Sequence, residues 1–365
     1  MIPNTPKRYI EKPKGHVVLD SNDAKLDTTD KLLPVLIALA MALGLAVGKV
    51  GGNTIAKINS LQVTNGVSLI IFLGLLLMLY PPLAKIKFYE FKPTAMNIKA
   101  ISVSILFNWI IGPTLMFALA WIFLANSPSL RTGLILVGIA RCIAMVVLWS
   151  DMAKGDSELT GMLVVLNSIF QLVAFSLLAY FYLWTLPHFL DLSGSLINIK
   201  FSLIAVNILI YLGTPLILAV AVRIIYEKIY DRDRYETHFC PKIGHVATAG
   251  LLFTVFMLFS ISGKYFLKQP LLILNVALAL VIYFVVMFSV AFFTAYKLNF
   301  GYKKTVSLAF TASGNNFELA IAVAIGVFGI ASNQALAGIT GPMVEIPVLV
   351  GLTYFARSLK PKFKN

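Results

Sequence analysis

Charged residues and cysteines are both scarce in this 365-residue chain. Charged residues make up only 13% of it, whereas they make up about a quarter of a typical soluble domain. The two cysteines, Cys142 and Cys240, are too few for a disulfide framework and lack the paired spacing of a zinc or redox motif. The sequence therefore argues against a soluble globular domain and against a structural disulfide.

Catalytic motifs are missing as well. The chain contains neither the His-Glu-x-x-His pattern of a zinc hydrolase nor the Gly-x-Ser-x-Gly turn of a serine hydrolase. Its four histidines lie outside the long apolar runs or at their edges. We therefore expect neither an enzyme nor a bound cofactor.

Acidic residues are few, 16 against 30 lysines and arginines, and the formal net charge is +14. Binding to nucleic acid would need basic residues clustered on one folded face, whereas here they lie between apolar runs. Membrane proteins concentrate Lys and Arg in their cytoplasmic loops. The charge therefore indicates topology in a lipid bilayer, and no nucleic-acid partner is expected.

Hydrophobic residues are abundant, at 59% of the chain. A transmembrane helix needs about 20 mostly apolar residues, so the length leaves room for roughly ten spans. Apolar runs bounded by charge, proline or glycine predict ten spans. They are expected near residues 32–48, 66–83, 100–124, 134–152, 159–186, 201–222, 243–261, 271–296, 306–330 and 335–355.

Lys and Arg are distributed unevenly between the loops on the two sides of these spans. The side of the N-terminal tail carries 23 of the 30, the opposite side carries six, and Arg141 lies within a span. This bias predicts a multi-pass protein of the plasma or inner membrane with both termini in the cytoplasm. Residues 1–31 are expected to form a polar tail without a cleavable signal peptide, and residues 357–365 a basic tail.

The predicted spans fall into two halves of five, residues 32–195 and 196–356. Because five is odd, the second half enters the membrane in the opposite sense, so any repeat is inverted. The fourth span of each half contains a polar or glycine-containing interruption, where inverted-repeat transporters break their helices. The predicted fold class is an all-α polytopic membrane protein of ten helices in a 5+5 inverted repeat.

Three ionisable groups lie deep in apolar sequence: Arg141, Glu318 and Glu345. A charge at the bilayer centre costs at least about 2.5 to 3.5 kcal/mol on insertion scales, so such groups usually serve transport or proton relay. The alternative is a structural ion pair, for example between Arg141 and Glu345. A membrane protein with only a structural role is disfavoured by all three.

Glu318 follows Gly314, Asn315 and Asn316, which are poor choices for a lipid-facing helix and favour an unwound segment. Freed carbonyls, two amides and a carboxylate offer ligands for a cation or hydrogen bonds for a polyhydroxylated solute. The alternative is a polar helix contact that only packs. Asn108, before a Gly-Pro pair, is open to the same two interpretations.

Arg141 and Cys142 place a guanidinium beside a thiol in sequence, although neighbouring helix positions point about 100° apart. A buried cysteine is most often a small core hydrophobe. Glu345 lies between Pro342 and Pro347, which loosen the last span on either side. There it is a plausible proton carrier, charged when it faces water and neutral when occluded.

Several segments resemble a known family. The motifs are Leu79–Lys85, Phe107–Pro113, Gly138–Val146, Asn167–Gln171, Asn315–Ala324 and Gly341–Leu349. Together they resemble the yeast-type arsenical-resistance permeases, within the bile acid/arsenite/riboflavin transporter superfamily. The resemblance runs from about Leu32 to Phe355 and leaves the N-terminal tail without an assigned role.

The resemblance implies ten helices with broken, crossed fourth and ninth helices. Helices 3–5 and 8–10 would form a core domain, and helices 1, 2, 6 and 7 a panel domain. It also implies export of arsenite, and sometimes antimonite, with a cysteine of the fourth helix and a glutamate of the tenth required. These correspond to Cys142, which would bind arsenic(III) as transported substrate, and Glu345. Asn108, Arg141, Asn315, Asn316 and Glu318 are the remaining candidates for the substrate cavity.

Trivalent arsenic is soft and favours sulfur, so a single thiol assisted by hydrogen bonds suits a substrate that must be released. The predicted mechanism is antiport, in which protonation of Glu345 from outside competes with substrate bound from inside. The alternative is a sodium-coupled importer of organic anions, since the superfamily also contains bile acid symporters. The Cys142 thiol separates the two hypotheses, because sodium binding needs only hard oxygen ligands.

Overall fold

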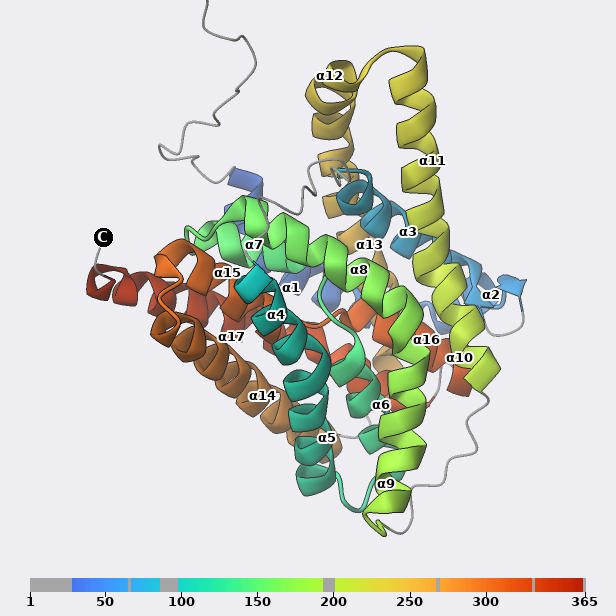
Figure 1. Ribbon diagram of the computed structural model, residues 1–365. Helices are drawn as coiled ribbons and strands as arrows, with labels where there is room; N and C mark the ends of the chain where they lie inside the picture. Colours follow the sequence, from blue (N-terminus) through green and yellow to red (C-terminus); the bar gives the residue numbers. More distant parts are fainter. Residues whose placement is uncertain are drawn as a thin grey trace, which may run out of the picture.

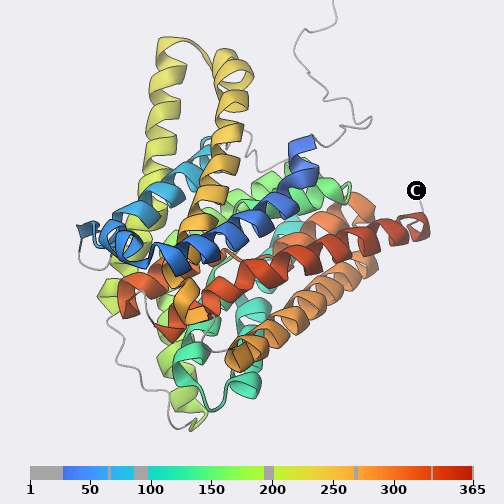
Figure 2. The ribbon, with the colours of Figure 1, turned by 180° about the vertical axis from the view of Figure 1, so that it is seen from behind.

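The computed structural model describes residues 28–64, 67–85, 98–192, 201–266, 270–329 and 332–363 of the chain. Most of the predicted N-terminal tail lies outside these residues, as do the loop around Asn198 between the predicted halves and the last two residues of the predicted C-terminal tail. Within them the protein is a bundle of helices with one small β-hairpin (Figures 1 and 2).

The helices and strands of the described residues follow one another in chain order. Before residue 193 they are α1 (Thr28–Val50), α2 (Gly52–Asn59), β1 (Gln62–Thr64), β2 (Val67–Ser68), α3 (Leu69–Ala84), α4 (Ile98–Leu106), η1 (Phe107–Ile111), α5 (Gly112–Phe123), α6 (Pro128–Ile139), α7 (Met145–Met152), α8 (Ser157–Tyr180), η2 (Phe181–Thr185) and α9 (Leu186–Phe189). After residue 200 they are α10 (Phe201–Ile208), η3 (Leu209–Gly213), α11 (Thr214–Ile229), α12 (Arg232–Arg234), η4 (Tyr235–Phe239), α13 (Cys240–Phe266), α14 (Pro270–Lys297), α15 (Gly301–Ser313), α16 (Phe317–Phe328), α17 (Asn333–Leu359) and η5 (Lys360–Lys362).

Seven helical stretches among the described residues are long and apolar enough to cross a membrane. They are Leu32–Val50, Ile98–Phe123, Ser157–Phe189, Ser202–Ile229, Arg232–Ile261, Pro270–Lys297 and Asn333–Lys362. Shorter apolar helices are Leu69–Ala84, Pro128–Ile139 and Phe317–Phe328. Every span predicted from the sequence overlaps one of these stretches. The antiparallel strands β1 and β2, which precede α3, were not predicted.

Four helical stretches contain a π turn that ends two residues before a proline. The turns are η1, η2, η3 and η4, and the prolines are Pro113, Pro187, Pro215 and Pro241. A proline ring clashes with the carbonyl four residues earlier and has no N–H to donate. In η1 the N–H of Gly112 donates to the carbonyl of Phe107, five residues back, which opens the turn before Pro113. The helices therefore continue through their prolines.

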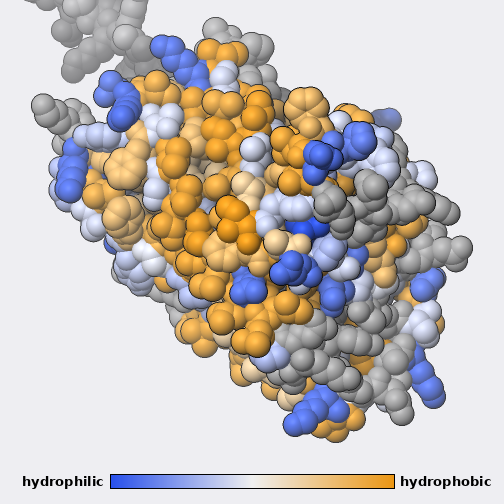
Figure 3. All heavy atoms as spheres, turned by 90° about the horizontal axis from the view of Figure 1, so that it is seen from below, coloured by the Kyte–Doolittle hydropathy of each residue, from blue (hydrophilic) through white to orange (hydrophobic). Residues whose placement is uncertain are grey.

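The outer surface of the bundle is largely apolar. On α14, for example, Tyr283 and Phe284 are fully buried, while Leu274 and Phe293 are about half exposed. Figure 3 shows hydrophobic residues covering much of one face, with fewer hydrophilic residues scattered among them. A helix that is hydrophobic on all sides lies in the core of a large protein or in lipid. The surface of this bundle is that of a protein embedded in a bilayer.

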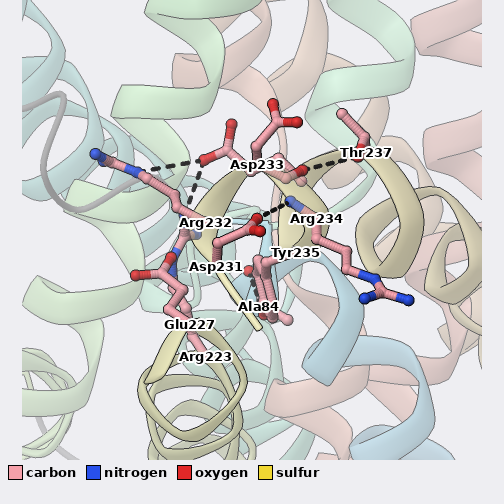
Figure 4. A network of polar contacts seen from close by, with 10 residues as sticks. Ala84, Arg223, Glu227, Asp231, Arg232, Asp233, Arg234, Tyr235 and Thr237 are labelled. Atoms are coloured by element: carbon pink, nitrogen blue, oxygen red, sulfur yellow. Dashed lines mark hydrogen bonds and ion pairs between the residues drawn. The ribbon is translucent and has the colours of Figure 1, made fainter. Parts of the chain in front are cut away.

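The hairpin of α11 and α13 projects beyond the other helices (Figures 1 and 2). Its charged residues form a network (Figure 4), in which Arg223 Nε donates to Glu227 Oε1 at 2.7 Å and Arg223 Nη2 donates to Glu236 Oε1 at 3.0 Å. The hydroxyl of Tyr235 donates to the carbonyl of Ala84 at 3.0 Å and so ties the hairpin to α3. These contacts explain why α11 continues beyond the end predicted at residue 222, since a search for apolar runs does not detect a helix stabilised by i,i+4 ion pairs.

Candidate functional site

Two helices are interrupted, and the interruptions lie against each other. The chain leaves helical geometry at residues 140–144, between α6 and α7, and at residues 314–316, between α15 and α16. The N–H of Cys142 donates to the carbonyl of Gly314 at 3.3 Å, and the N–H of Asn316 donates to the carbonyl of Ala140 at 2.9 Å. Arg141 and Asn315 thus form an antiparallel bridge. We call residues 140–144 and 314–316 the paired break.

Asparagine side chains replace the helical hydrogen bonds lost at the paired break. Asn315 Nδ2 donates to the carbonyls of Val137 and Ala140, at 2.8 and 3.3 Å, and so caps the C-terminal end of α6. Asn316 Oδ1 accepts the N–H of Leu319 at 3.0 Å and caps the N-terminal end of α16. These bonds explain why the sequence Gly314-Asn-Asn unwinds the chain here.

Arg141 is fully buried and makes all its side-chain hydrogen bonds to uncharged oxygen atoms. Its Nε donates to Asn108 Oδ1 at 3.0 Å, and its Nη1 donates to the hydroxyl of Tyr283 at 2.6 Å and to the carbonyl of Gly138 at 3.3 Å. Its Nη2 donates to the carbonyl of Ala312. Among the described residues Arg141 has no ion pair with Glu345, so the structural salt bridge considered from the sequence is not present.

Cys142 is 2% exposed, and its thiol lies where three elements meet. Its Sγ accepts the N–H of Val146 at 3.3 Å, so the first turn of α7 directs a donor at the sulfur. Gly314 lies directly against it, because a β-carbon at Gly314 would stand 3.0 Å from Cys142 Cβ and 3.6 Å from Sγ. The carboxyl groups of Glu345 and Glu318 are near enough to act electrostatically on the thiol.

Glu345, which lies on α17, is also near the paired break. It is 3% exposed, and its helix packs against α6, α7 and α16, which flank the paired break. The helix approaches closely because Gly341 leaves room for the ring of Phe317, which a β-carbon would overlap at 1.7 Å. Glu318, 8% exposed in the first turn of α16, acts electrostatically on Glu345. Two buried carboxyl groups from two helices therefore lie near the paired break.

Several buried polar atoms around the paired break have no hydrogen-bond partner. They are Glu345 Oε1, Asn315 Oδ1, Asn316 Nδ2 and Gln171 Nε2. Gln171 reaches the break directly, since its Oε1 accepts the N–H of Arg141 at 2.5 Å. Most buried polar groups are paired, so a cluster of unpaired donors and acceptors indicates a place for a polar ligand.

The structure therefore places every candidate residue from the sequence in one region. Some of these residues form the paired break, and the others lie next to it or contact it. Arg141, Cys142, Asn315 and Asn316 form the paired break itself, and Glu318 and Glu345 adjoin it. Asn108 reaches it only through Arg141 and otherwise donates to Ser104.

Sequence reasoning missed Tyr283 and Gly112. A β-carbon at Gly112 would stand 3.0 Å from both Arg141 Nη1 and the Tyr283 hydroxyl, so this glycine leaves space for their hydrogen bond. The one signal for Tyr283 was a hydroxyl in the middle of an apolar run.

Comparison with known proteins identifies the family. The family model described as the sodium bile acid symporter family matches residues 72–269, more than half of the chain. The chain is 48% identical over 339 residues to the arsenical-resistance protein Acr3 of Corynebacterium glutamicum, covering 93% of this chain and 91% of the relative. This chain belongs to the sodium bile acid symporter family, in the branch of the arsenical-resistance proteins. The family predicted from the sequence motifs is confirmed.

Two further relatives are more distant. The arsenical-resistance protein Acr3 of Alkaliphilus metalliredigens is 29% identical over 344 residues, with 88% of this chain and 90% of the relative covered. An uncharacterized transporter of Synechocystis is 29% identical over 346 residues, with 90% and 88% covered. The family and the apolar helices together make this chain a multi-pass membrane protein.

Proposed function

We propose that this chain exports arsenite from the cell and so confers resistance to arsenic. The observation that carries the proposal is the thiol of Cys142, buried beside the paired break among unpaired donors and acceptors. The 48% identity to an arsenical-resistance protein supports the same substrate class. Antimonite, which is also trivalent and thiophilic, is a second substrate under this proposal.

Arsenite in neutral water is a small uncharged trihydroxide, and its chemistry matches the groups at the paired break. Condensation with the thiol forms one sulfur–arsenic bond and releases one water molecule, and hydrolysis reverses the step. The remaining hydroxyl groups donate to Glu345 Oε1 and Asn315 Oδ1 and accept from Asn316 Nδ2. One thiol holds arsenic less firmly than three would, which permits release on the other side.

The proposed architecture is ten spans in a 5+5 inverted repeat. The seven long stretches, together with α3, α6 continued by α7, and α15 continued by α16, supply ten spans. The fourth and ninth of these are the interrupted ones. Packing of α13 against α1 and α3 supports a panel, and packing of α14 against α15 and α17 supports a core. The bias of Lys and Arg supports cytoplasmic termini in the plasma or inner membrane.

Proton antiport is the proposed mode of coupling, with Glu345 as the proton carrier. Its carboxyl is buried and near enough to act electrostatically on the thiol, so its protonation changes the surroundings that the substrate meets. A membrane potential assists inward proton movement by about 2.3 kcal/mol per charge per 100 mV.

Inverted vesicles with an imposed pH gradient and potential test this coupling. In the intact chain, arsenite uptake should increase with the imposed pH gradient and with the imposed potential. In Glu345→Gln, uptake should depend on neither the pH gradient nor the potential. Glu158→Gln, which changes an exposed carboxyl at the start of α8, serves as the control. Uptake by the intact chain that ignores the gradient and the potential contradicts antiport.

A sodium-coupled organic anion symporter is the second candidate, favoured by the description of the matched family. The two functions differ in their need for a thiol. The decisive experiment measures arsenite accumulation in export-deficient cells that express the intact chain, Cys142→Ser or Cys240→Ser, with membrane insertion checked for each.

We expect the intact chain and Cys240→Ser to lower accumulation and Cys142→Ser to leave it at the level of cells without the protein. If the intact chain does not lower it, arsenite export is wrong, and sodium-dependent uptake of an organic anion is measured instead. If Cys142→Ser exports as well as the intact chain, the role of the thiol is wrong.

A further inference from the structure

Arg141 lies between the C-terminal ends of two interrupted helices. It donates to the carbonyl of Gly138 in the last turn of α6 and to that of Ala312 in the last turn of α15. The last carbonyls of a helix lack helical partners and carry its negative dipole end, so both helix ends attract a cation. The guanidinium supplies that cation from within the chain.

The remaining acceptors complete a shell of uncharged oxygen atoms. The amide oxygen of Asn108 and the hydroxyl of Tyr283 lie at 3.0 and 2.6 Å from the guanidinium nitrogens. Four of the five N–H donors of the group are thereby used. Carbonyls of half-helix ends and of unwound backbone are also the ligands that transporters offer to a coupling sodium ion. The shell around Arg141 therefore consists of the kinds of oxygen atom that also bind small cations.

We propose that Arg141 is a tethered cation, which takes the place of a dissociable sodium ion between the ends of α6 and α15. A guanidinium stays protonated at any physiological pH, so the positive charge at the paired break does not depend on ion binding. The consequence is a transporter that works without sodium, although its family is described as sodium symporters. The transport consequence rests on the proposed export of arsenite, whereas occupancy of the cation site does not.

The first test uses the purified protein and no substrate. Arg141→Ala leaves the two helix ends and the shell of oxygen atoms without a cation, so the thermal midpoint should fall. Sodium, lithium or guanidinium at millimolar concentration should raise the midpoint of Arg141→Ala relative to choline, and should leave that of the intact chain unchanged. Urea, which has a similar planar shape but no charge, should have no such effect.

Arg131 provides a matched control. It is also buried at 2% exposure, and its Nη1 donates to the carbonyls of Leu124 and Ala125 at the end of α5. Its guanidinium instead stacks on the ring of Trp121, 3.6 Å from the centroid, and lies outside the paired break. Arg131→Ala should lose stability without regaining it from sodium or guanidinium in excess of urea.

The second test measures arsenite transport in proteoliposomes. The intact chain should transport equally in sodium and choline buffers. Arg141→Ala should fall by about tenfold or more in choline, because buried acceptors lose their partner, and should recover part of the rate when sodium or guanidinium is added. Arg141→Lys should retain part of the rate without any cation, because it keeps the charge.

Two results would overturn the tethered cation. In the first, Arg141→Ala has the same thermal midpoint and the same transport rate as the intact chain. In the second, Arg141→Ala loses both, no addition of sodium, lithium or guanidinium restores them, and Arg141→Lys does not transport either. If the intact chain transports no arsenite but small cations still stabilise Arg141→Ala selectively, the proposed function is wrong and the cation site stands.

Discussion

Two buried arginines of this protein have opposite surroundings. Arg223, in the projecting hairpin, lies between the carboxylates of Glu227 and Glu236 and 4.9 Å from the ring of Tyr235 (Figure 4). Arg141, at the paired break, contacts only uncharged oxygen atoms. The hairpin pairs its arginine with carboxylates, as a structural network does, whereas the guanidinium at the paired break makes no ion pair among the described residues. The difference separates a structural ion-pair network from the site that we propose for transport.

The hairpin and the paired break also differ in how completely their polar groups are satisfied. The carboxylates in the hairpin network are about a quarter exposed, so water completes their hydrogen bonds. At the paired break, polar atoms of Asn315, Asn316 and Glu345 are buried without partners. Leaving a buried polar group unpaired costs about 1–3 kcal/mol. Such a cost is tolerated at a site that a polar substrate fills.

The largest expected effect comes from adding one methyl group at the paired break. Gly314→Ala would place a β-carbon 3.0 Å from Cys142 Cβ, so the two segments must move apart by a few tenths of an ångström. Displacement of a reacting group costs up to about 100-fold in rate for a shift of 1 Å, so arsenite efflux should fall by at least about tenfold. Gly161→Ala in α8, where a β-carbon meets nothing within 4 Å, is the matched control. Equal efflux by both variants contradicts the close approach.

A smaller effect is expected from Asn108→Ala. This change removes the acceptor of Arg141 Nε and leaves a buried charged donor without a partner, at a cost of about 1–3 kcal/mol. Efflux assays should show a fall of about fivefold, which corresponds to the lower end of this cost, and Asn108→Asp should differ by pairing with the guanidinium. If Asn108→Ala matches the intact chain in both efflux and thermal midpoint, the hydrogen bond contributes nothing.

Arg223→Ala should affect stability and not transport. The variant removes the cation of Glu227 and leaves Glu236 with Arg232, 3.9 Å away. Because both carboxylates are partly exposed, the expected cost of about 1–3 kcal/mol is below that of breaking a fully buried pair. Thermal denaturation should show the loss, while arsenite efflux per inserted molecule should equal that of the intact chain. A transport defect in correctly inserted Arg223→Ala would remove the distinction between the two arginines.

The smallest effect is expected from Tyr235→Phe. The change removes only the hydrogen bond from Tyr235 to the carbonyl of Ala84, since the ring remains. A single hydrogen bond contributes about 1 kcal/mol of net stability, so the thermal midpoint should fall slightly and efflux should stay unchanged. A loss larger than that of Arg223→Ala would mean that the bond between the hairpin and α3 contributes more stability than the ion pairs within the hairpin.

The sequence by itself determined the embedding of the chain and the identity of its unusual residues. Composition and apolar runs depend only on local order, so they predicted the positions of most apolar helices to within a few residues, apart from charged extensions such as that of α11. The same local information identified Arg141, Glu318 and Glu345 as unusual residues, because a charged residue within an apolar run can be recognised without a structure. Gly314, Asn315 and Asn316 predicted the second break through their poor helix propensity.

Only the tertiary structure decided which of these groups meet. Arg141 and Ala312 are far apart in the sequence, as are Cys142 and Gly314, and nothing local records their contact. The same holds for Tyr283. In the sequence it is one tyrosine in an apolar run, and only the packing of α14 in the folded protein places its hydroxyl beside Arg141. Hydrophobicity places a helix in the bilayer, but lipid surrounds every apolar face alike. Close packing at glycines and the pairing of buried polar groups then select the neighbours.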